Sequence, residues 1–230
     1  MIKHKFNPLP RNGELGISLG NSAHEGENLR RMLTWTHDNF AQTIITLSDT
    51  LYRFNLMDEG CDEDHAYEQS RALGDAWLQR NQAVLHSFDP ARLKIIRWDE
   101  WRAHPDFQKT HEDLVDFYHN HTPFREALHK DVAAFRARRE KAGKPAPESD
   151  HAINFLLEEG AGYILIGRTY QSLRIYPSHD LHCFKYLRKN TVPTPLKGLE
   201  LAPYFDFRGV MTLENANQNH KINSPVNKFG

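Results

Sequence analysis

Short apolar segments alternate with longer amphipathic ones along the chain, and this alternation is the feature that most constrains its fold. The predicted strands are residues 14–19, 43–47, 93–96, 162–167 and 172–176. The predicted helices are residues 28–40, 64–85, 104–141, 151–159 and 179–189. The fourth strand segment also fits an extension of the helix before it. Strands that alternate with helices indicate a mostly parallel sheet with helices on both faces, which is an α/β fold.

Two breaks are expected within the helical segments. Thr122-Pro123 interrupts the helix predicted over residues 104–141, and Gly160 ends the helix predicted over residues 151–159. Glu159 would then stand at a helix C-terminus, where a carboxylate is unfavourable for the helix dipole. A charge kept in such a position indicates a functional role.

The length of 230 residues suits one sizeable domain, which we place at residues 1–190. Residues 191–230 are rich in Pro and Asn, so we expect a loosely ordered C-terminal extension. No apolar run approaches the roughly 18 residues that a membrane-spanning helix needs, and the N-terminus lacks the apolar core of a secretory signal. Two widely separated cysteines, Cys61 and Cys183, fit a reducing compartment, and we predict a cytoplasmic protein.

Ser18 and Tyr176 lie at the carboxyl ends of the first and last predicted strands. Ligands of open parallel sheets bind beyond these ends, so both side chains are expected to face one pocket. The run Gly16-Ile17-Ser18-Leu19-Gly20 also matches the GxSxG pattern of a hydrolase nucleophile elbow. That pattern usually occurs deeper within a sheet than the first strand, but a serine hydrolase or acyltransferase acting on small esters stays open as an alternative. Its catalytic base would be His24, His151 or His179.

Other common cofactor motifs are missing from the sequence. It contains neither GxGxxG nor GxxxxGK[ST], so no dinucleotide or P-loop site is predicted. The pairs His119/His121 and His179/His182 have a spacing that metals accept, but no further ligands accompany them. We therefore predict no cofactor and no metal.

Three motifs occur in a defined order between Glu14 and Lys189. The first is residues 16–22, followed at helical distance by Leu33-Thr34-Trp35; the second is residues 154–159; and the third is Arg174-Ile175-Tyr176-Pro177. Together they resemble the motifs of cyclodipeptide synthases, in the group with Tyr-Pro before the last helix. The resemblance implies a Rossmann-like fold similar to the catalytic domains of class I tyrosyl- and tryptophanyl-tRNA synthetases, without their ATP motifs.

The resemblance also implies a ping-pong reaction that uses two aminoacyl-tRNAs. Ser18 would take the first aminoacyl group as an ester, a dipeptidyl ester would follow, and its free amine would release the cyclic dipeptide. Glu159 would hold the α-amino group by a charge-assisted hydrogen bond, and Tyr176 would relay protons. Phe155 stands where the family usually has Tyr, so Glu159 must act without that hydroxyl. A tRNA-binding module without catalysis is the second alternative.

By position in the family, Glu14, Trp98 and Arg174 would line the pocket for the first amino acid. Gly16, Asn21 and Phe155 are the other expected substrate-binding residues. Two of the three pocket positions are charged, so Glu14 and Arg174 either pair with each other or bind a polar side chain. We expect at least one polar amino acid among the substrates.

The tRNA contacts must come from local basic clusters, because the formal net charge is −1. The densest cluster comprises Arg136, Arg138, Arg139 and Lys141. A second cluster, Lys185, Arg188 and Lys189, lies on the last predicted helix. Beyond the two aminoacyl-tRNAs, we expect no membrane and no obligatory protein partner, and we expect a monomer.

Overall fold

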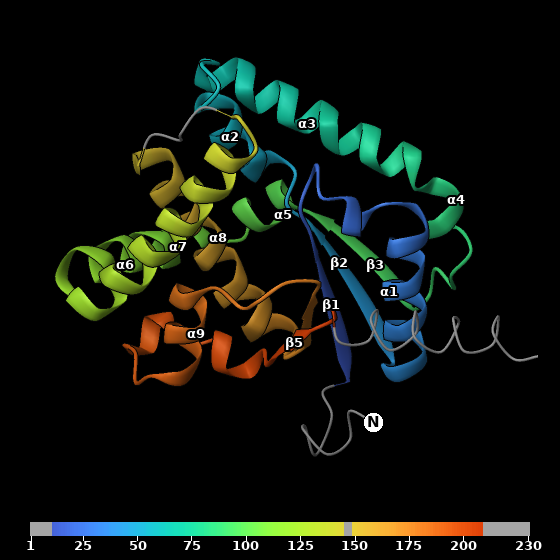
Figure 1. Ribbon diagram of the computed structural model, residues 1–230. Helices are drawn as coiled ribbons and strands as arrows, with labels where there is room; N and C mark the ends of the chain where they lie inside the picture. The colour runs from blue at the N-terminus through green and yellow to red at the C-terminus, as the bar shows by residue number, and fades with distance from the viewer. Residues whose placement is uncertain (1–10, 145–148, 209–230) are drawn as a thin grey trace, which may run out of the picture.

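A parallel sheet forms the centre of the computed structural model, which describes residues 11–144 and 149–208 (Figure 1). Its strands are β1 Asn12–Ile17, β2 Gln42–Leu47, β3 Leu93–Arg97, β4 Leu173–Tyr176 and β5 Tyr204–Asp206. Their order in the sheet is β3-β2-β1-β4-β5, and every neighbouring pair is parallel. The chain winds outward from β1 to β3 and then returns to the other side of β1. The topological switch point, where ligands bind in such sheets, therefore lies between β1 and β4.

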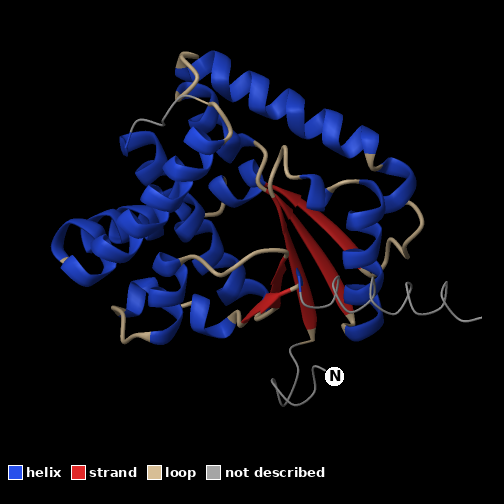
Figure 2. Ribbon diagram, in the orientation of Figure 1, coloured by secondary structure: helices blue, strands red, loops and turns tan. Residues whose placement is uncertain are grey.

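Helices cover both faces of this sheet (Figure 2). The α-helices are α1 Gly26–Asn39, α2 Arg53–Met57, α3 Glu63–Arg80, α4 Gln82–Leu85, α5 Trp98–Arg102, α6 Phe107–Asn120, α7 Thr122–Lys141, α8 Ser149–Tyr170 and α9 His182–Lys189. Short 3-10 turns are η1 Ser22–His24, η2 Thr50–Tyr52, η3 Thr194–Leu196 and η4 Leu199–Leu201. The predicted break at Thr122-Pro123 is confirmed, because α7 begins there with its proline in the first turn. The predicted α/β class with a parallel sheet is also confirmed.

The two faces of β1 carry different kinds of side chain, since successive residues of a strand point to opposite faces. Leu15 and Ile17 pack with Leu29 of α1 and Trp77 of α3 in one apolar core. Glu14 and Gly16 alternate with them and meet the opposite layer, where Gly16 approaches Tyr163 of α8. Glu14, which the sequence analysis expected in the substrate pocket, is therefore fully buried on the α8 side of the sheet.

The predicted strand at residues 162–167 is wrong, and so is the predicted helix end at Gly160. Both belong to the interior of α8, which continues to Tyr170. Glycine is needed there for close packing, because a Cβ at Gly162 would lie 2.3 Å from the Trp98 ring and one at Gly167 would lie 2.2 Å from the Gly198 carbonyl oxygen. A helix that is buried on all sides shows no apolar stripe, so periodicity could not distinguish it from a strand.

Residues 192–207 belong to the folded domain, which corrects the expectation of a loosely ordered extension from residue 191 for this part of it. β5 pairs with β4, with Phe205 opposite Ile175. Leu196 and Phe207 are fully buried, so this segment adds both a strand and core side chains. Residues 209–230 of the predicted extension lie outside the described residues.

Candidate active site

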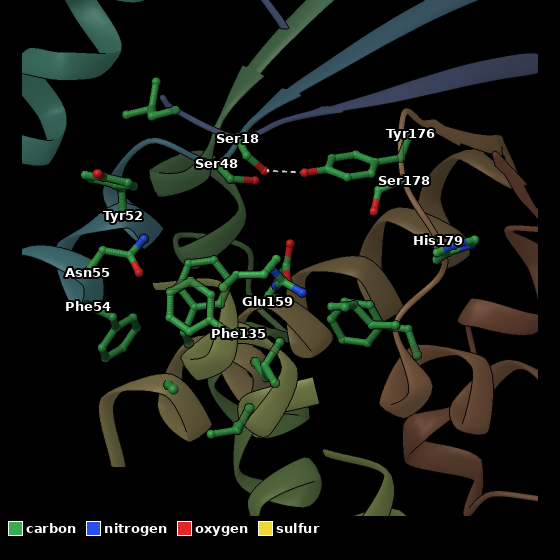
Figure 3. Close-up of a pocket in the computed structure, with 18 of the residues that line it drawn as sticks. Ser18, Ser48, Tyr52, Phe54, Asn55, Phe135, Glu159, Tyr176, Ser178 and His179 are labelled. Carbon is green, nitrogen blue, oxygen red and sulfur yellow. Dashed lines mark hydrogen bonds between the residues drawn. The ribbon is translucent and has the colours of Figure 1, made fainter. Parts of the chain in front are cut away.

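Ser18 and Tyr176 meet at the switch point of the sheet (Figure 3). Ser18 directly follows β1, and Tyr176 is the last residue of the neighbouring strand β4. Their hydroxyl oxygens are 3.0 Å apart, which is a hydrogen-bond distance. The sequence analysis expected these two side chains to face one pocket, and the structure brings them together there.

A cavity of about 360 Å³ adjoins this pair of hydroxyl groups. Glu159 and Ser48 supply polar groups to the lining near Ser18, and Arg174 also lines the cavity. Four aromatic side chains from η2, α2, α7 and α8 also line the cavity: Tyr52, Phe54, Phe135 and Phe155. Charged side chains accompany them, namely Asp58, Arg138, Arg139 and Lys144. The cavity thus combines aromatic surface with a limited number of polar and charged groups, which is typical of a small-molecule site.

Glu159 lies in the interior of α8, not at a helix end, so the predicted conflict with the helix dipole does not exist. Its side chain is buried, and its Oε2 has no hydrogen-bond partner among the described residues. Burial raises the pKa of Glu159 to about 7, although the nearby Arg174 guanidinium and the Tyr163 hydroxyl both act to lower it. A carboxyl group with this pKa can bind a cation or exchange a proton near neutral pH.

Arg174 joins the pocket to a buried group of charges beneath it. It lies opposite Glu14 in the register of β1 and β4, and its Nε is 3.9 Å from the Glu14 carboxylate. Its Nη2 is 3.9 Å from Glu159, and its guanidinium carbon stands 3.1 Å above the centre of the Tyr163 ring. Glu14 and Arg174 therefore lie within ion-pair distance, which is one of the two arrangements that the sequence left open, but they share no hydrogen bond.

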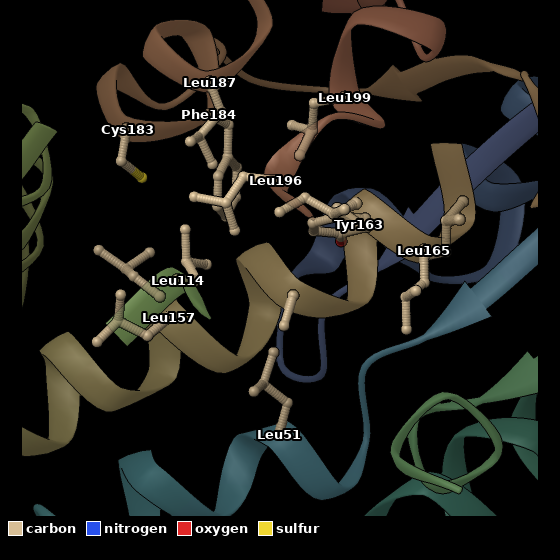
Figure 4. Packing of buried hydrophobic residues seen from close by; sticks show 14 of the residues in the cluster. Leu51, Leu114, Leu157, Tyr163, Leu165, Cys183, Phe184, Leu187, Leu196 and Leu199 are labelled. Atoms are coloured by element: carbon tan, nitrogen blue, oxygen red, sulfur yellow. The ribbon is translucent and has the colours of Figure 1, made fainter. Parts of the chain in front are cut away.

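Tyr163 connects this charged group to a second apolar core, which lies on the α8 side of the sheet (Figure 4). Its ring packs edge-on against Phe184 of α9 and against Trp98. Gly16 allows Tyr163 to approach β1, since a Cβ there would lie 3.0 Å from the Tyr163 hydroxyl. Sequence reasoning missed Tyr163 because it fell in a segment that was predicted as a strand.

Of the predicted substrate-binding residues, Trp98 and Asn21 do not line the cavity and instead make contacts within the fold. Trp98 begins α5 instead of lying in β3; it is fully buried, and its Nε1 donates a 2.9 Å hydrogen bond to Glu158. The Asn21 side chain accepts a hydrogen bond from the backbone of Ala23 and so caps η1. Phe155 does line the cavity, where it packs edge-on against Phe54.

The predicted basic cluster on α7 is divided by the fold. Arg138 is exposed and lines the cavity, and Lys141 is exposed nearby on the same helix. Arg139 is buried and pairs with Glu59 at 3.2 Å, so it is not a surface residue. Arg136 is half-buried. In the second cluster, Arg188 is largely buried and pairs with Asp180, whereas Lys185 and Lys189 are exposed.

The geometry does not favour the serine hydrolase alternative. A catalytic histidine must reach the serine hydroxyl, but His24 Nδ1 accepts a 2.9 Å hydrogen bond from the backbone N–H of Ser18. His151 is hydrogen-bonded to Asp58 at 3.0 Å, and His179 contacts Arg208. In the described part of the chain, the hydrogen-bond partner of the Ser18 hydroxyl is Tyr176.

The fold and the site together define a Rossmann-like enzyme with a serine at its switch point. Comparison with known proteins identifies the family to which it belongs. The sequence model of the cyclodipeptide synthase family matches residues 13–164. None of the curated proteins compared with the chain matches it. Over the residues that the structure describes, no helix is long and apolar enough to cross a membrane.

Solved structures of the same family share the fold. A cyclodipeptide synthase from Fluoribacter dumoffii is 24% identical, with a TM-score of 0.69, over 77% of this chain and 82% of that one. A Mycobacterium tuberculosis protein, described as demonstrating that cyclodipeptide synthetases are related to type I tRNA synthetases, is 18% identical, with a TM-score of 0.68, over 85% and 84%. A cyclodipeptide synthase from Candidatus Glomeribacter gigasporarum, bound to Phe-tRNA, is 17% identical, with a TM-score of 0.61, over 84% of each chain.

The family model covers well over half of the sequence, and the chain therefore belongs to the cyclodipeptide synthase family. It is an aminoacyl-tRNA-dependent enzyme that makes cyclic dipeptides.

Proposed function

We propose that this enzyme works by a ping-pong mechanism in which Ser18 carries both the aminoacyl and the dipeptidyl intermediate. The observation that carries the proposal is the hydroxyl pair of Ser18 and Tyr176 at the edge of a cavity that also contains the Glu159 carboxyl group. A serine needs an activated acyl donor or a nearby base. An aminoacyl-tRNA supplies the activated ester, and Tyr176 is the hydroxyl that can pass on the proton.

In the first step, the Ser18 oxygen attacks the ester carbonyl of the first aminoacyl-tRNA. The bond from this carbonyl to the terminal ribose breaks, and the serine proton reaches the ribose oxygen through Tyr176. In the second step, the α-amine of the bound aminoacyl group attacks the ester carbonyl of the second aminoacyl-tRNA and forms the first amide. The bond from this carbonyl to the terminal ribose breaks, and the proton lost by the amine ends on the ribose oxygen of the released tRNA. In the third step, the new α-amine attacks the Ser18 ester, forms the second amide and restores the serine hydroxyl.

Glu159 is proposed to hold the α-ammonium group of the first aminoacyl unit. Its unpartnered Oε2 and its position in the cavity support this role. Binding of a cation favours the ionised carboxylate, so the raised pKa would fall when the substrate binds. Glu159 would then be able to accept a proton when the amine has to become a nucleophile.

We further propose that at least one of the two amino acids has a polar side chain. Arg174 lines the cavity, and its Nε and Nη1 are buried without hydrogen-bond partners among the described residues. Both carboxylate oxygens of Glu14, which lies beneath Arg174, are also buried without hydrogen-bond partners among the described residues. Buried polar groups of this kind are costly unless a ligand satisfies them, so a hydrogen-bonding side chain suits the cavity beside Arg174 better than an aliphatic one.

The acceptor end of the tRNA is proposed to approach along α7. The exposed Arg138 and Lys144 both line the cavity, and the exposed Lys141 lies between them in the chain. Replacing Arg138 and Lys141 together by Glu should weaken tRNA binding and reduce its salt dependence. The matched control is Lys109→Glu on the exposed side of α6, for which unchanged binding is expected. Equal weakening by both variants would contradict this assignment.

The reaction is tested by expressing the protein in a bacterial host and analysing the medium for cyclic dipeptides by mass spectrometry. We expect new cyclic dipeptides from the wild type, and their side chains would identify both substrates. Ser18→Ala should abolish them, whereas Ser48→Ala, which changes a second serine of the same cavity, should not. Cyclic dipeptides that persist in the Ser18→Ala variant would refute the proposed mechanism.

A further inference from the structure

His24 is buried directly behind the serine, and neither the reaction nor the comparisons give it a role. It ends η1, six residues after Ser18, and is 1% exposed. Its backbone carbonyl accepts a 3.0 Å hydrogen bond from Nε1 of Trp77, which is fully buried in α3. The turn that carries His24 is therefore attached to α3, which packs on the same side of the sheet as α1.

The His24 ring contacts the backbone of the nucleophile. Its Nδ1 lies 2.9 Å from the amide nitrogen of Ser18, which donates the hydrogen bond. Nδ1 also lies 3.3 Å from the Ser18 carbonyl oxygen, but its shorter contact is with the amide. As acceptor of that N–H, Nδ1 carries no hydrogen, so the ring hydrogen of the neutral form is assigned to Nε2, which has no hydrogen-bond partner among the described residues. Burial lowers the pKa of His24 to about 4, and the ring is consequently neutral at pH 7.

The same ring also contacts the second hydroxyl-bearing residue of the site. His24 and Tyr176 pack edge to face, with ring centroids 5.1 Å apart and an interplanar angle of 70°. His24 thus touches the backbone of Ser18 and the ring of Tyr176, the two residues whose hydroxyl oxygens are 3.0 Å apart.

We propose that His24 is a positioning residue that holds Ser18 and Tyr176 in their reactive arrangement, by accepting the Ser18 backbone N–H and by packing against the Tyr176 ring. This proposal rests on the proposed role of Ser18 as the nucleophile. It has one further consequence for the chemistry. Because the Ser18 N–H is engaged by His24, it does not stabilise the oxyanion, which must be bound by other donors.

Two substitutions separate the two contacts. His24→Asn keeps an acceptor at the position of Nδ1 but removes the ring, whereas His24→Phe keeps a ring beside Tyr176 but leaves the Ser18 N–H without its acceptor. The matched controls are His37→Asn and His37→Phe, because His37 in α1 also packs edge-on against an aromatic ring, Phe88, but lies away from the site.

The experiment measures transfer of an aminoacyl group from charged tRNA to Ser18 in a single turnover, together with the dissociation constant for the tRNA. Thermal unfolding gives the folded fraction by which each rate is corrected. We expect the acylation rate constant to fall about tenfold or more in His24→Phe and by a smaller factor in His24→Asn, with unchanged tRNA affinity in both and no change in the His37 variants.

Corrected rates in both His24 variants equal to those of the His37 controls would overturn the proposal. A loss that appears only as weaker tRNA binding would also overturn it. The result for the wild-type protein distinguishes a failure of the His24 proposal from a failure of the proposed serine mechanism. If wild-type protein forms no ester on Ser18, the proposed mechanism fails; if it forms the ester and the His24 variants form it equally fast, the role of His24 alone fails.

Discussion

Removal of a single hydroxyl group, by Tyr163→Phe, should raise the pH at which the enzyme becomes active. The Tyr163 hydroxyl favours the ionised Glu159 carboxylate and so lowers a pKa that burial has raised to about 7. Phenylalanine retains the ring beneath the Arg174 guanidinium, which stands 3.1 Å from its centre. The substitution therefore removes the interaction of the hydroxyl with the carboxylate, which is at most a hydrogen bond to a charged group, and leaves the packing in place.

The size of the effect follows from the bond that is lost. A hydrogen bond to a charged group contributes about 1.5 kcal/mol, and about 1.4 kcal/mol corresponds to one pKa unit. The lost bond had favoured the ionised carboxylate, so the pKa of Glu159 should rise by about one unit, to about 8. Ionised Glu159 is the form proposed to bind the α-ammonium group, so activity should appear only at a higher pH.

The assay is the pH dependence of kcat/KM for cyclic dipeptide formation, which reports ionisations of the free enzyme and free substrate. The wild type should show an acidic limb centred near pH 7, and Tyr163→Phe should move that limb up by about one pH unit. Tyr186→Phe is the matched control, since this tyrosine is hydrogen-bonded to His121 outside the cavity, and it should leave the limb unchanged. An acidic limb that stays in place or moves to lower pH in Tyr163→Phe would refute the reasoning.

Three other predictions concern stability. Burial raises the folded-state pKa of Glu159 from 4.5 to about 7, so the stability associated with this group is fully present below pH 4.5 and is lost as the pH rises through 7. At pH 8 the free energy of unfolding of Glu159→Gln, measured with urea, should therefore exceed that of the wild type by at most about 3 kcal/mol. This difference should vanish near pH 4.5. Gly162→Ala puts a methyl group 2.3 Å from the Trp98 ring and should cost about 1–3 kcal/mol, measured by urea unfolding, whereas a neutral result would show that α8 can shift. Asp131 accepts the backbone N–H groups of His182 and Cys183 at 3.0 and 2.9 Å, so Asp131→Ala should lower stability by about 1–2 kcal/mol and speed hydrogen exchange in α9, and unchanged exchange there would contradict this capping role.

The edge of the sheet that carries the site could be predicted from the sequence. Short β-branched runs identified β2 and β3, and the positions of Ser18 and Tyr176 after their strands placed both at one edge. This inference is robust because the carboxyl ends of parallel strands meet at the same edge regardless of how the helices pack.

The interior of the site could not be predicted in the same way. Glu14 and Arg174 face each other only because β1 and β4 pair in one particular register, which the sequence does not state. Arg139 is buried because Glu59, which follows α2, reaches it from a distant part of the chain. Tyr163 became recognisable as a neighbour of Glu159 only once both were seen to lie one turn apart on a single helix.

The most direct test of the central claim is the intact mass of the protein after incubation with a full set of charged tRNAs. We predict a wild-type species heavier by one aminoacyl group, which peptide mapping assigns to Ser18, and the same species in Ser48→Ala but not in Ser18→Ala. Failure of the wild type to acquire any aminoacyl group, or an equal gain in mass in Ser18→Ala, would contradict the role of Ser18 as the nucleophile.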